Sequence, residues 1–115
     1  MDYRGVDNLW GIVPLAKIFG KNKLSIYAYK EIELDSDRAA IFKAGTNDGV
    51  VCWLNETKVH ENIIDRSLTV DEDVFNVQLK KGKNKVLLKI LNSGGNWEFC
   101  LRICDTNGVP MKNIQ

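Results

Sequence analysis

Short runs of alternating apolar and polar residues, separated by glycine and asparagine, are the feature that most limits what this chain can fold into. Residues 24–33 place aliphatic side chains on one parity and tyrosines on the other. A period of two residues is typical of an extended strand with one buried side, whereas an amphipathic helix has a period near 3.6. Because no stretch of useful length shows the helical period, the pattern predicts an all-β protein.

Further runs of this kind predict additional strands and two hairpins. Residues 39–44 form one strand candidate. The first hairpin covers residues 50–60 and reverses around Asn55, since asparagine tolerates the positive φ of tight turns. The second covers residues 74–92 and reverses around Gly82. Several short strands joined by Gly/Asn turns favour a sandwich or barrel over alternating βαβ units.

The last run, residues 97–105, predicts a strand with a core side and an outer side. Charged residues and two of the three cysteines occupy the outer parity. Cys100 and Cys104 are four residues apart on one face, roughly 13 Å along a strand, which is too far for a disulfide. No C-x-x-C motif is present, and Cys52 could pair with Cys100 or Cys104 only across strands, so three free thiols are expected. The core parity consists of Trp97, Phe99, Leu101 and Ile103.

Length and charge narrow the classes of function. At 115 residues the chain is expected to form one module, residues 1–115. A formal net charge of +1 provides no broad field for a polyanion, so nucleic acid is not an expected partner. The cationic run Lys80–Lys85 is interpreted as a solvated hairpin end. A membrane partner is not expected either, because no apolar run reaches the roughly 18 residues of a spanning helix.

Two segments resemble a known family of modules. Residues 44–55, Ala-Gly-Thr-Asn-Asp-Gly-Val-Val-Cys-Trp-Leu-Asn, are similar to a "G-S-D-D-G-V-x-V-W-L-N-G" signature, and residues 79–103 are similar to an "L-x-x-G-x-N-x-L-L-L-K-V…G-G-x-W-x-F-x-L-R-I" close. Both belong to PA14-like and galactose-binding-domain-like β-sandwich modules. The resemblance covers roughly residues 24–105 and implies an antiparallel β-sandwich of jelly-roll type.

The resemblance also implies a setting for the function. Such modules are commonly appended to secreted bacterial glycoside hydrolases, esterases and other polysaccharide-processing enzymes. The implied partners are a polysaccharide or oligosaccharide glycan and a neighbouring catalytic domain of a parent chain. The implied location is extracellular or at the cell surface as part of a secreted parent. The N-terminus, residues 1–5, lacks the basic and apolar regions of a signal peptide. This does not decide the location, because a module excised from its parent would have lost the parent's leader.

Two departures from the family signature affect the expected site. PA14-type lectins hold Ca²⁺ with an Asp-Asp pair, and here the pair is Asn47-Asp48. A calcium site at Asn47 and Asp48 is a possible cofactor site with one negative charge fewer, so its affinity should be lower. The turn glycine expected after Asn55 is Glu56, which predicts a longer reversal around Thr57.

No residue pattern predicts catalysis. His60 is the only histidine, no G-x-S-x-G motif accompanies it, and it is interpreted as a residue that hydrogen-bonds within its own turn. Most of the acidic residues that could supply a glycosidase pair are interpreted as solvated strand ends, since nothing in the sequence places one in an apolar environment. They are Glu31, Glu33, Asp35, Asp37 and the run Asp71-Glu72-Asp73. The chain is therefore not expected to be an enzyme.

Sugar contacts are expected from polar side chains in the loops at one end of the sandwich. Amide, carboxylate and guanidinium groups suit hydroxyl recognition because they donate or accept hydrogen bonds. Trp53 and Trp97 are predicted to lie in the core, while Trp10 is the tryptophan expected to show a face to solvent. The predicted ligand-binding residues are Asn47, Asp48, Arg66, Asn92, Asn96 and Trp10.

The sequence thus favours a non-catalytic carbohydrate-binding or accessory module of a polysaccharide-active or cell-surface protein. The alternative is a structural interaction module that packs on a neighbouring domain without binding sugar, which a large exposed apolar patch would favour. A shallow groove with an open aromatic face would instead favour sugar binding. A small hydrolase is a third alternative.

Overall fold

The computed structural model describes residues 10–15, 18, 25–64, 66, 68, 72–92 and 97–111, with side chains from Pro14 onward. Its named elements are all strands, and among the described residues no helix is long and apolar enough to cross a lipid bilayer. The strands are β1 (Trp10–Pro14), β2 (Ser25–Leu34), β3 (Arg38–Asn47), β4 (Val50–Leu54), β5 (Thr57–Asn62), β6 (Asp73–Leu79), β7 (Gly82–Leu91) and β8 (Glu98–Cys104).

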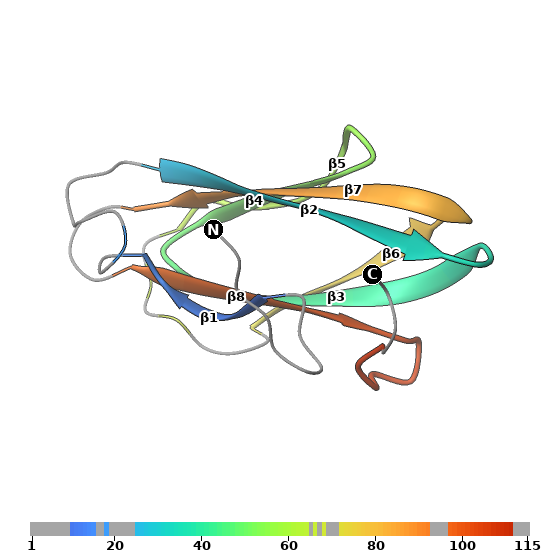
Figure 1. The fold of residues 1–115 in the computed structure, drawn as a ribbon. Coiled ribbons are helices and arrows are strands. Elements are labelled where there is room, and N and C mark those ends of the chain that lie inside the picture. The colour runs from blue at the N-terminus through green and yellow to red at the C-terminus, as the bar shows by residue number, and fades with distance from the viewer. Residues whose placement is uncertain are drawn as a thin grey trace.

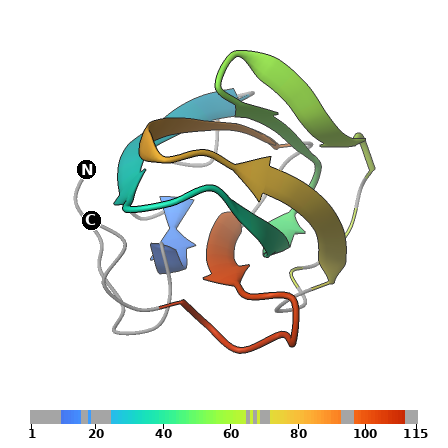
Figure 2. The same ribbon diagram turned by 90° about the vertical axis from the view of Figure 1, so that its right-hand side faces the viewer.

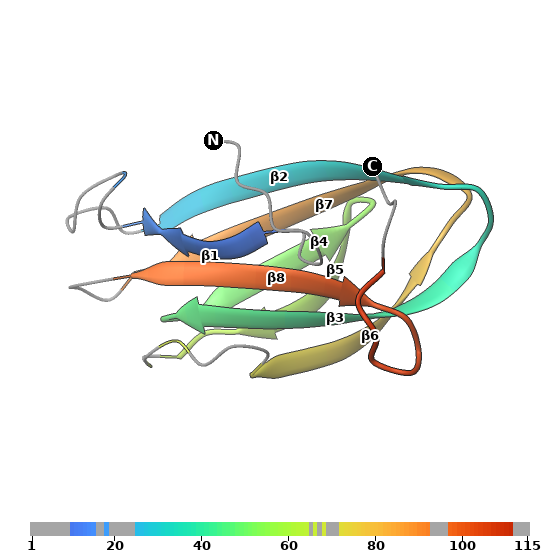
Figure 3. The same cartoon turned by 60° about the horizontal axis from the view of Figure 1, so that its bottom comes forward.

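The strands form two antiparallel sheets that pack face to face (Figure 1). One sheet has the order β1-β8-β3-β6 and is seen from its outer side in Figure 3, while the other has the order β2-β7-β4-β5. First and last strands pair, and so do second and seventh, third and sixth, and fourth and fifth, which is the nesting of a jelly roll. The predicted antiparallel β-sandwich of jelly-roll type is confirmed.

The core lies between the sheets and is built by the alternation visible in the sequence. In β2, Ala28 and Ile32 are buried while Tyr27 and Tyr29 are exposed, as a period of two requires. The core parity of the last run is buried as well, so the prediction for Trp97 is confirmed. Fully burying one aliphatic or phenylalanine side chain stabilises the fold by about 1.5–3 kcal/mol, so the layer between the sheets is the main source of stability.

All three cysteines are buried, and none of them forms a disulfide, as predicted. Cys52 faces the core, and burial raises the pKa of its thiol to about 12, so the thiol stays protonated and unreactive at neutral pH. Cys100 and Cys104 lie on the outer parity of β8 and are nevertheless covered. Part of this cover comes from the chain after β8, where Pro110 pairs with Cys104 across an isolated bridge.

The predicted second hairpin is wrong, because β6 and β7 belong to different sheets. The chain crosses between the layers at the end of the sandwich that faces the viewer in Figure 2. Gly82 has a φ of 92°, and the Asn84 side chain bonds to the backbone of Lys80 and Gly82. A hairpin turn and a corner between sheets use the same turn residues, so the local pattern could not distinguish them.

The first predicted hairpin is confirmed as the β4–β5 pair, but the longer reversal expected around Thr57 is wrong. The turn has two central residues, Asn55 and Glu56, with φ values of 52° and 72°. Asn55 is bound to β7, since its N–H donates to Lys85 O at 2.9 Å and its Oδ1 accepts from Lys85 N at 2.9 Å. These contacts hold the tight turn although glutamate disfavours a positive φ.

We expect Glu56→Gly to raise the free energy of unfolding by about 0.5–1 kcal/mol. The left-handed region costs an L-residue roughly 1–2 kcal/mol, and the extra unfolded-state entropy of glycine returns part of this gain. Urea unfolding followed by circular dichroism measures the change. Lys58→Gly, within β5, is the matched control and should lower stability, because glycine weakens a strand interior. A Glu56→Gly variant less stable than the parent would contradict the conclusion that the positive φ of Glu56 costs stability.

Candidate functional site

The structure brings four of the predicted ligand-binding residues to one end of the sandwich, around the β3–β4 connection. The Asn47-Asp48 peptide bond is cis, Asp48 N–H donates to Leu91 O at 3.3 Å beside Asn92, and Arg66 N–H donates to Asp48 Oδ1 at 3.1 Å. Asn96 lies outside the described residues. The Trp10 backbone pairs with Leu101 in the middle of β8, away from this end, and the Trp10 side chain lies outside the described residues.

Arg66 joins this end of the sandwich into a buried network. Its guanidinium donates to Asp73 Oδ1 at 2.8 Å and to Asp73 Oδ2 at 3.1 Å. It also donates to Thr46 O at 3.0 Å and to Thr46 Oγ1 at 2.7 Å. The side chains of Arg66 and Asp73 are only 9% and 6% exposed. The guanidinium therefore holds the segment after β5 against β3 and β6 rather than facing solvent.

Asp73 is buried, unlike the solvated strand ends expected for most of the acidic residues, and it has three partners. Besides Arg66, His60 Nε2 lies 3.0 Å from Oδ2 and Asn62 Nδ2 donates to Oδ1 at 3.2 Å. Burial alone would raise the pKa of Asp73, but the hydrogen bonds from Arg66 and His60, the charge of Arg66 and the bond from Asn62 outweigh it and lower the pKa. The prediction that His60 bonds within its own turn is wrong, since its partner is on β6 and its ring stacks on Phe75 at 4.3 Å.

The donor set at Asn47 and Asp48 is a poor fit for calcium. Asp48 is buried and its Oδ1 already accepts a backbone N–H, while the guanidinium of Arg66 binds both Thr46 oxygens close by. A divalent cation there would meet a positive charge. In the described part of the chain, no three His, Cys, Asp or Glu side chains are grouped to hold a metal ion. Calcium at Asn47 and Asp48 stays a prediction.

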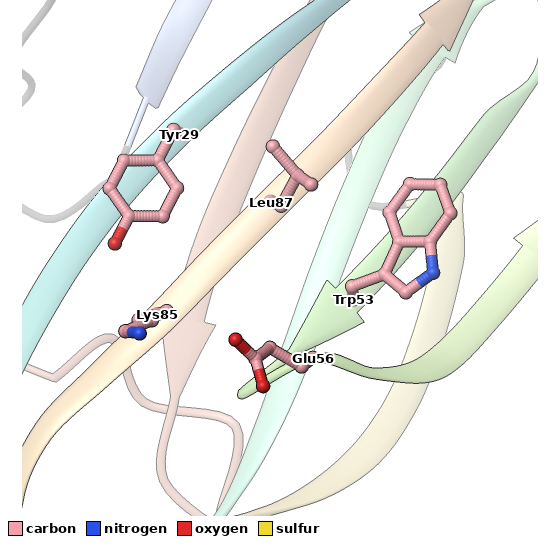
Figure 4. A pocket seen from close by; sticks show the side chains of 5 residues that line it. All are labelled: Tyr29, Trp53, Glu56, Lys85 and Leu87. Atoms are coloured by element: carbon pink, nitrogen blue, oxygen red, sulfur yellow. The ribbon is translucent and has the colours of Figure 1, made fainter.

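A groove of about 370 Å³ opens elsewhere, on the outer face of the β2-β7-β4-β5 sheet. Its lining, shown in Figure 4, is Tyr29, Trp53, Glu56, Lys85 and Leu87. Tyr29 and Trp53 are both register partners of Leu87, so an aromatic side chain stands on each side of a leucine floor. We call this feature the aromatic groove.

The aromatic groove overturns the prediction that Trp53 is a core residue. In β4, Val50, Cys52 and Leu54 face the core and are buried, which leaves Trp53 on the outer face and only partly covered. Val51, which shares the outer parity with Trp53, is buried nevertheless. Because both parities of β4 are apolar, alternation could not reveal which one faces the core.

Tyrosines from β2 extend the aromatic groove. Tyr27 and Tyr29 are 57% and 51% exposed, and the Tyr27 ring lies 6.4 Å from the Trp53 ring. Desolvation and the hydrogen bond from Tyr29 Oη to Glu31 at 3.0 Å raise the pKa of Tyr29, so its hydroxyl stays protonated. The sequence did carry a signal for these residues, since tyrosines occupied the parity where polar residues were expected. An open face of aromatic rings with donors and acceptors at its edge suits a ligand that is both apolar and polar.

Comparisons with known proteins place the architecture. No protein-family model matches the sequence, and no curated protein matches it. The chain is similar in structure to the PA14 domain of the antifreeze protein MpAFP, with a TM-score of 0.62, 17% identity and coverage of 78% of this chain and 50% of that chain.

Two further solved structures carry anti-sigma factor domains in their descriptions. An anti-sigma factor domain-containing protein matches with a TM-score of 0.67, 20% identity and coverage of 96% of this chain and 40% of that chain. Another, from Clostridium clariflavum, matches with a TM-score of 0.63, 15% identity and coverage of 84% and 32%. The chain spans half or less of the length of these structures, and the likeness concerns the fold.

Proposed function

From the premise that the chain has a PA14-like fold, we propose that it is a non-catalytic accessory module that binds carbohydrate in the aromatic groove. The observation that carries this proposal is the open space between Tyr29 and Trp53 on the sheet face. Aromatic rings stack on the C–H face of a sugar ring, while hydroxyl, ammonium and carboxylate groups bond to its hydroxyls. The loop residues Asn47, Asp48, Arg66, Asn92 and Asn96, with Trp10, remain a prediction.

The proposal that the module is non-catalytic is supported by the state of its candidate reactive groups. The Cys52 thiol, with a pKa of about 12, is no nucleophile at neutral pH. His60 is already engaged by Asp73 and stacked on Phe75. Neither group is available to activate a substrate in the aromatic groove, because Cys52 faces the core on the other side of β4 and His60 is bound to β6.

The role proposed for such a module is to tether a parent protein to its polymer. Binding one glycan segment raises the effective concentration of a linked catalytic domain at that glycan, without any new contact by the catalytic domain itself. The proposed setting is a secreted or cell-surface parent chain with a neighbouring polysaccharide-active domain. A chain that spans only a part of structurally similar proteins suits such a modular use.

We expect Trp53→Ala to weaken glycan binding at least about tenfold, because central aromatic side chains dominate binding free energies and 1.4 kcal/mol corresponds to tenfold. Calorimetry and affinity gel retardation on soluble glycans measure the loss. Val74→Ala, an exposed apolar residue on β6 of the opposite sheet, is the matched control and should bind as the parent does. Glycan binding that survives Trp53→Ala, or no binding to any glycan of the panel, would contradict the proposal.

A second candidate function is a module that packs on a neighbouring domain without binding sugar. Ile63 and Ile64 favour it, because these two adjacent isoleucines after β5 are both exposed. Such a module would bind no glycan and would bury both side chains in the parent protein. Hydrogen exchange of the isolated chain and of the full parent distinguishes the two functions, since only packing protects the segment after β5 in the parent.

A further inference from the structure

We infer that the aromatic groove takes an uncharged glycan chain of at least two sugars, laid across the strands, and discriminates against acidic glycans. This inference rests on the proposed carbohydrate-binding function and specifies the ligand class of the same site. Two independent features carry it, namely the spacing of the aromatic side chains and the arrangement of charges at the edge of the groove.

The spacing sets the length and direction of the ligand. Tyr29, Leu87 and Trp53 lie on one line across three neighbouring strands, β2, β7 and β4. Two inter-strand spacings separate the outer two by roughly 10 Å at the backbone, wider than one sugar ring. A single sugar can therefore stack on one aromatic ring only. A chain of two or more sugars that crosses the strands can engage both.

The charges near the groove are balanced and include carboxylates. Lys85 faces Glu31 in register, and Glu56 lines the same groove. The lining carries one ammonium and one carboxylate, and Lys58, which faces Trp53 in register, is already paired with Glu61. An acidic sugar would therefore meet no net positive charge and would lie beside the like charge of Glu56, and like charges at an interface discriminate against the wrong ligand. Lys89, whose ammonium lies 5.7 Å from the centroid of the Tyr27 ring, is not part of the groove lining. Hydroxyl groups fit this surface without a net electrostatic penalty.

Lys85 and Glu56 are placed to form hydrogen bonds with neighbouring hydroxyls of a sugar. Figure 4 shows the ammonium and the carboxylate at the same end of the groove. Neither forms an ion pair with another described residue. Lysine only donates and an ionised glutamate only accepts, so together they match a pair of hydroxyls on one sugar. Glutamate also occupies this turn at a φ of 72°, and local strain of this kind is concentrated at functional sites.

The test titrates the whole chain by calorimetry with neutral β-1,4-linked hexasaccharides of glucose, mannose and xylose, with hexagalacturonate, and with the corresponding monosaccharides. We expect at least one neutral hexasaccharide to bind at least about tenfold more tightly than both hexagalacturonate and its own monosaccharide, a difference of 1.4 kcal/mol or more. Its affinity should change little when salt is raised, because no net charge is neutralised.

Variants distinguish a failure of this inference from a failure of the proposed carbohydrate binding. Glu56→Gln keeps the side-chain size and should narrow the preference for neutral over acidic hexasaccharides several-fold, whereas Glu33→Gln, farther along β2 and outside the groove lining, should leave it unchanged. Hexagalacturonate that binds as tightly as the neutral chains, with binding still lost in Trp53→Ala, would overturn this inference and leave the proposed function standing. Absence of binding to every hexasaccharide would overturn both.

Discussion

Arg66→Met is expected to lower the free energy of unfolding by about 3–5 kcal/mol, the usual effect of removing one partner from a buried ion pair. The variant leaves the Asp73 carboxylate, 6% exposed, without its charged partner and removes the two bonds that bind the guanidinium to Thr46. Methionine keeps much of the apolar stem of arginine, so the loss reports on the guanidinium. Folded domains are stable by only about 5–15 kcal/mol, and a loss of this size is large.

Urea unfolding at neutral and acidic pH measures this effect and its charge dependence. The folded pKa of Asp73 is lowered, so the stabilisation by its carboxylate is complete above the ordinary aspartate pKa and disappears as the pH falls through the folded pKa. The parent and Arg66→Met should therefore converge in acid. Glu72→Gln is the matched control, because Glu72 is exposed and 3.7 Å from the guanidinium, and should change stability by less than about 1 kcal/mol. If Arg66→Met lowers the free energy of unfolding only slightly, and by the same amount at every pH, the buried Arg66–Asp73 pair does not have the proposed stabilising role.

Asn84→Leu is expected to cost roughly 3 kcal/mol or more of stability, although the leucine side chain branches at the same carbon. The Asn84 side chain is 0% exposed, and its Oδ1 accepts from Lys80 N at 3.0 Å and from Asn55 Nδ2 at 3.1 Å. Its Nδ2 donates to Lys80 O at 2.9 Å and to Gly82 O at 3.2 Å. Leucine would leave these groups unpaired, and each buried unpaired group costs about 1–3 kcal/mol.

Thermal and urea unfolding of Asn84→Leu provide the measurement, with Lys83→Leu as the matched control at the preceding, exposed position of β7. The control should stay within about 0.5 kcal/mol of the parent. Because Asn84 binds Asn55, its replacement should also loosen the turn that carries Glu56 and reduce glycan affinity. An Asn84→Leu variant as stable as Lys83→Leu would show that these hydrogen bonds contribute little.

The strands and their buried sides could be predicted because alternation relates residues that are neighbours in the chain. The tyrosines of β2 and the core parity of β8 are examples, and both lie where the pattern placed them. The same pattern was ambiguous in β4, where Val51 and Trp53 make the outer parity as apolar as the inner one. The pattern could not distinguish a hairpin from a crossing between sheets at Gly82, because a turn residue bends the chain without selecting the sheet that receives the next strand.

The candidate site was only partly visible in the sequence. The gathering of Asp48 and Arg66 at one end of the sandwich agrees with the prediction of a shared loop region, although Arg66 turns inward to Asp73. The aromatic groove was missed, since its lining comes from three strands and a turn. Tyr29 and Trp53 are far apart in the chain and become neighbours only through their common partner Leu87 on β7.

The sequence by itself determined that this chain forms strands, which side of most strands is apolar, and that Cys100 and Cys104 form no disulfide with each other. Those properties depend on residue type and on spacing within a few positions. The tertiary structure alone decided that the chain crosses between sheets after β6, that Arg66 pairs with Asp73, and that Trp53 faces outward. Each of these depends on contacts between distant segments, and the packing free energy that selects among them arises only when both sheets are assembled.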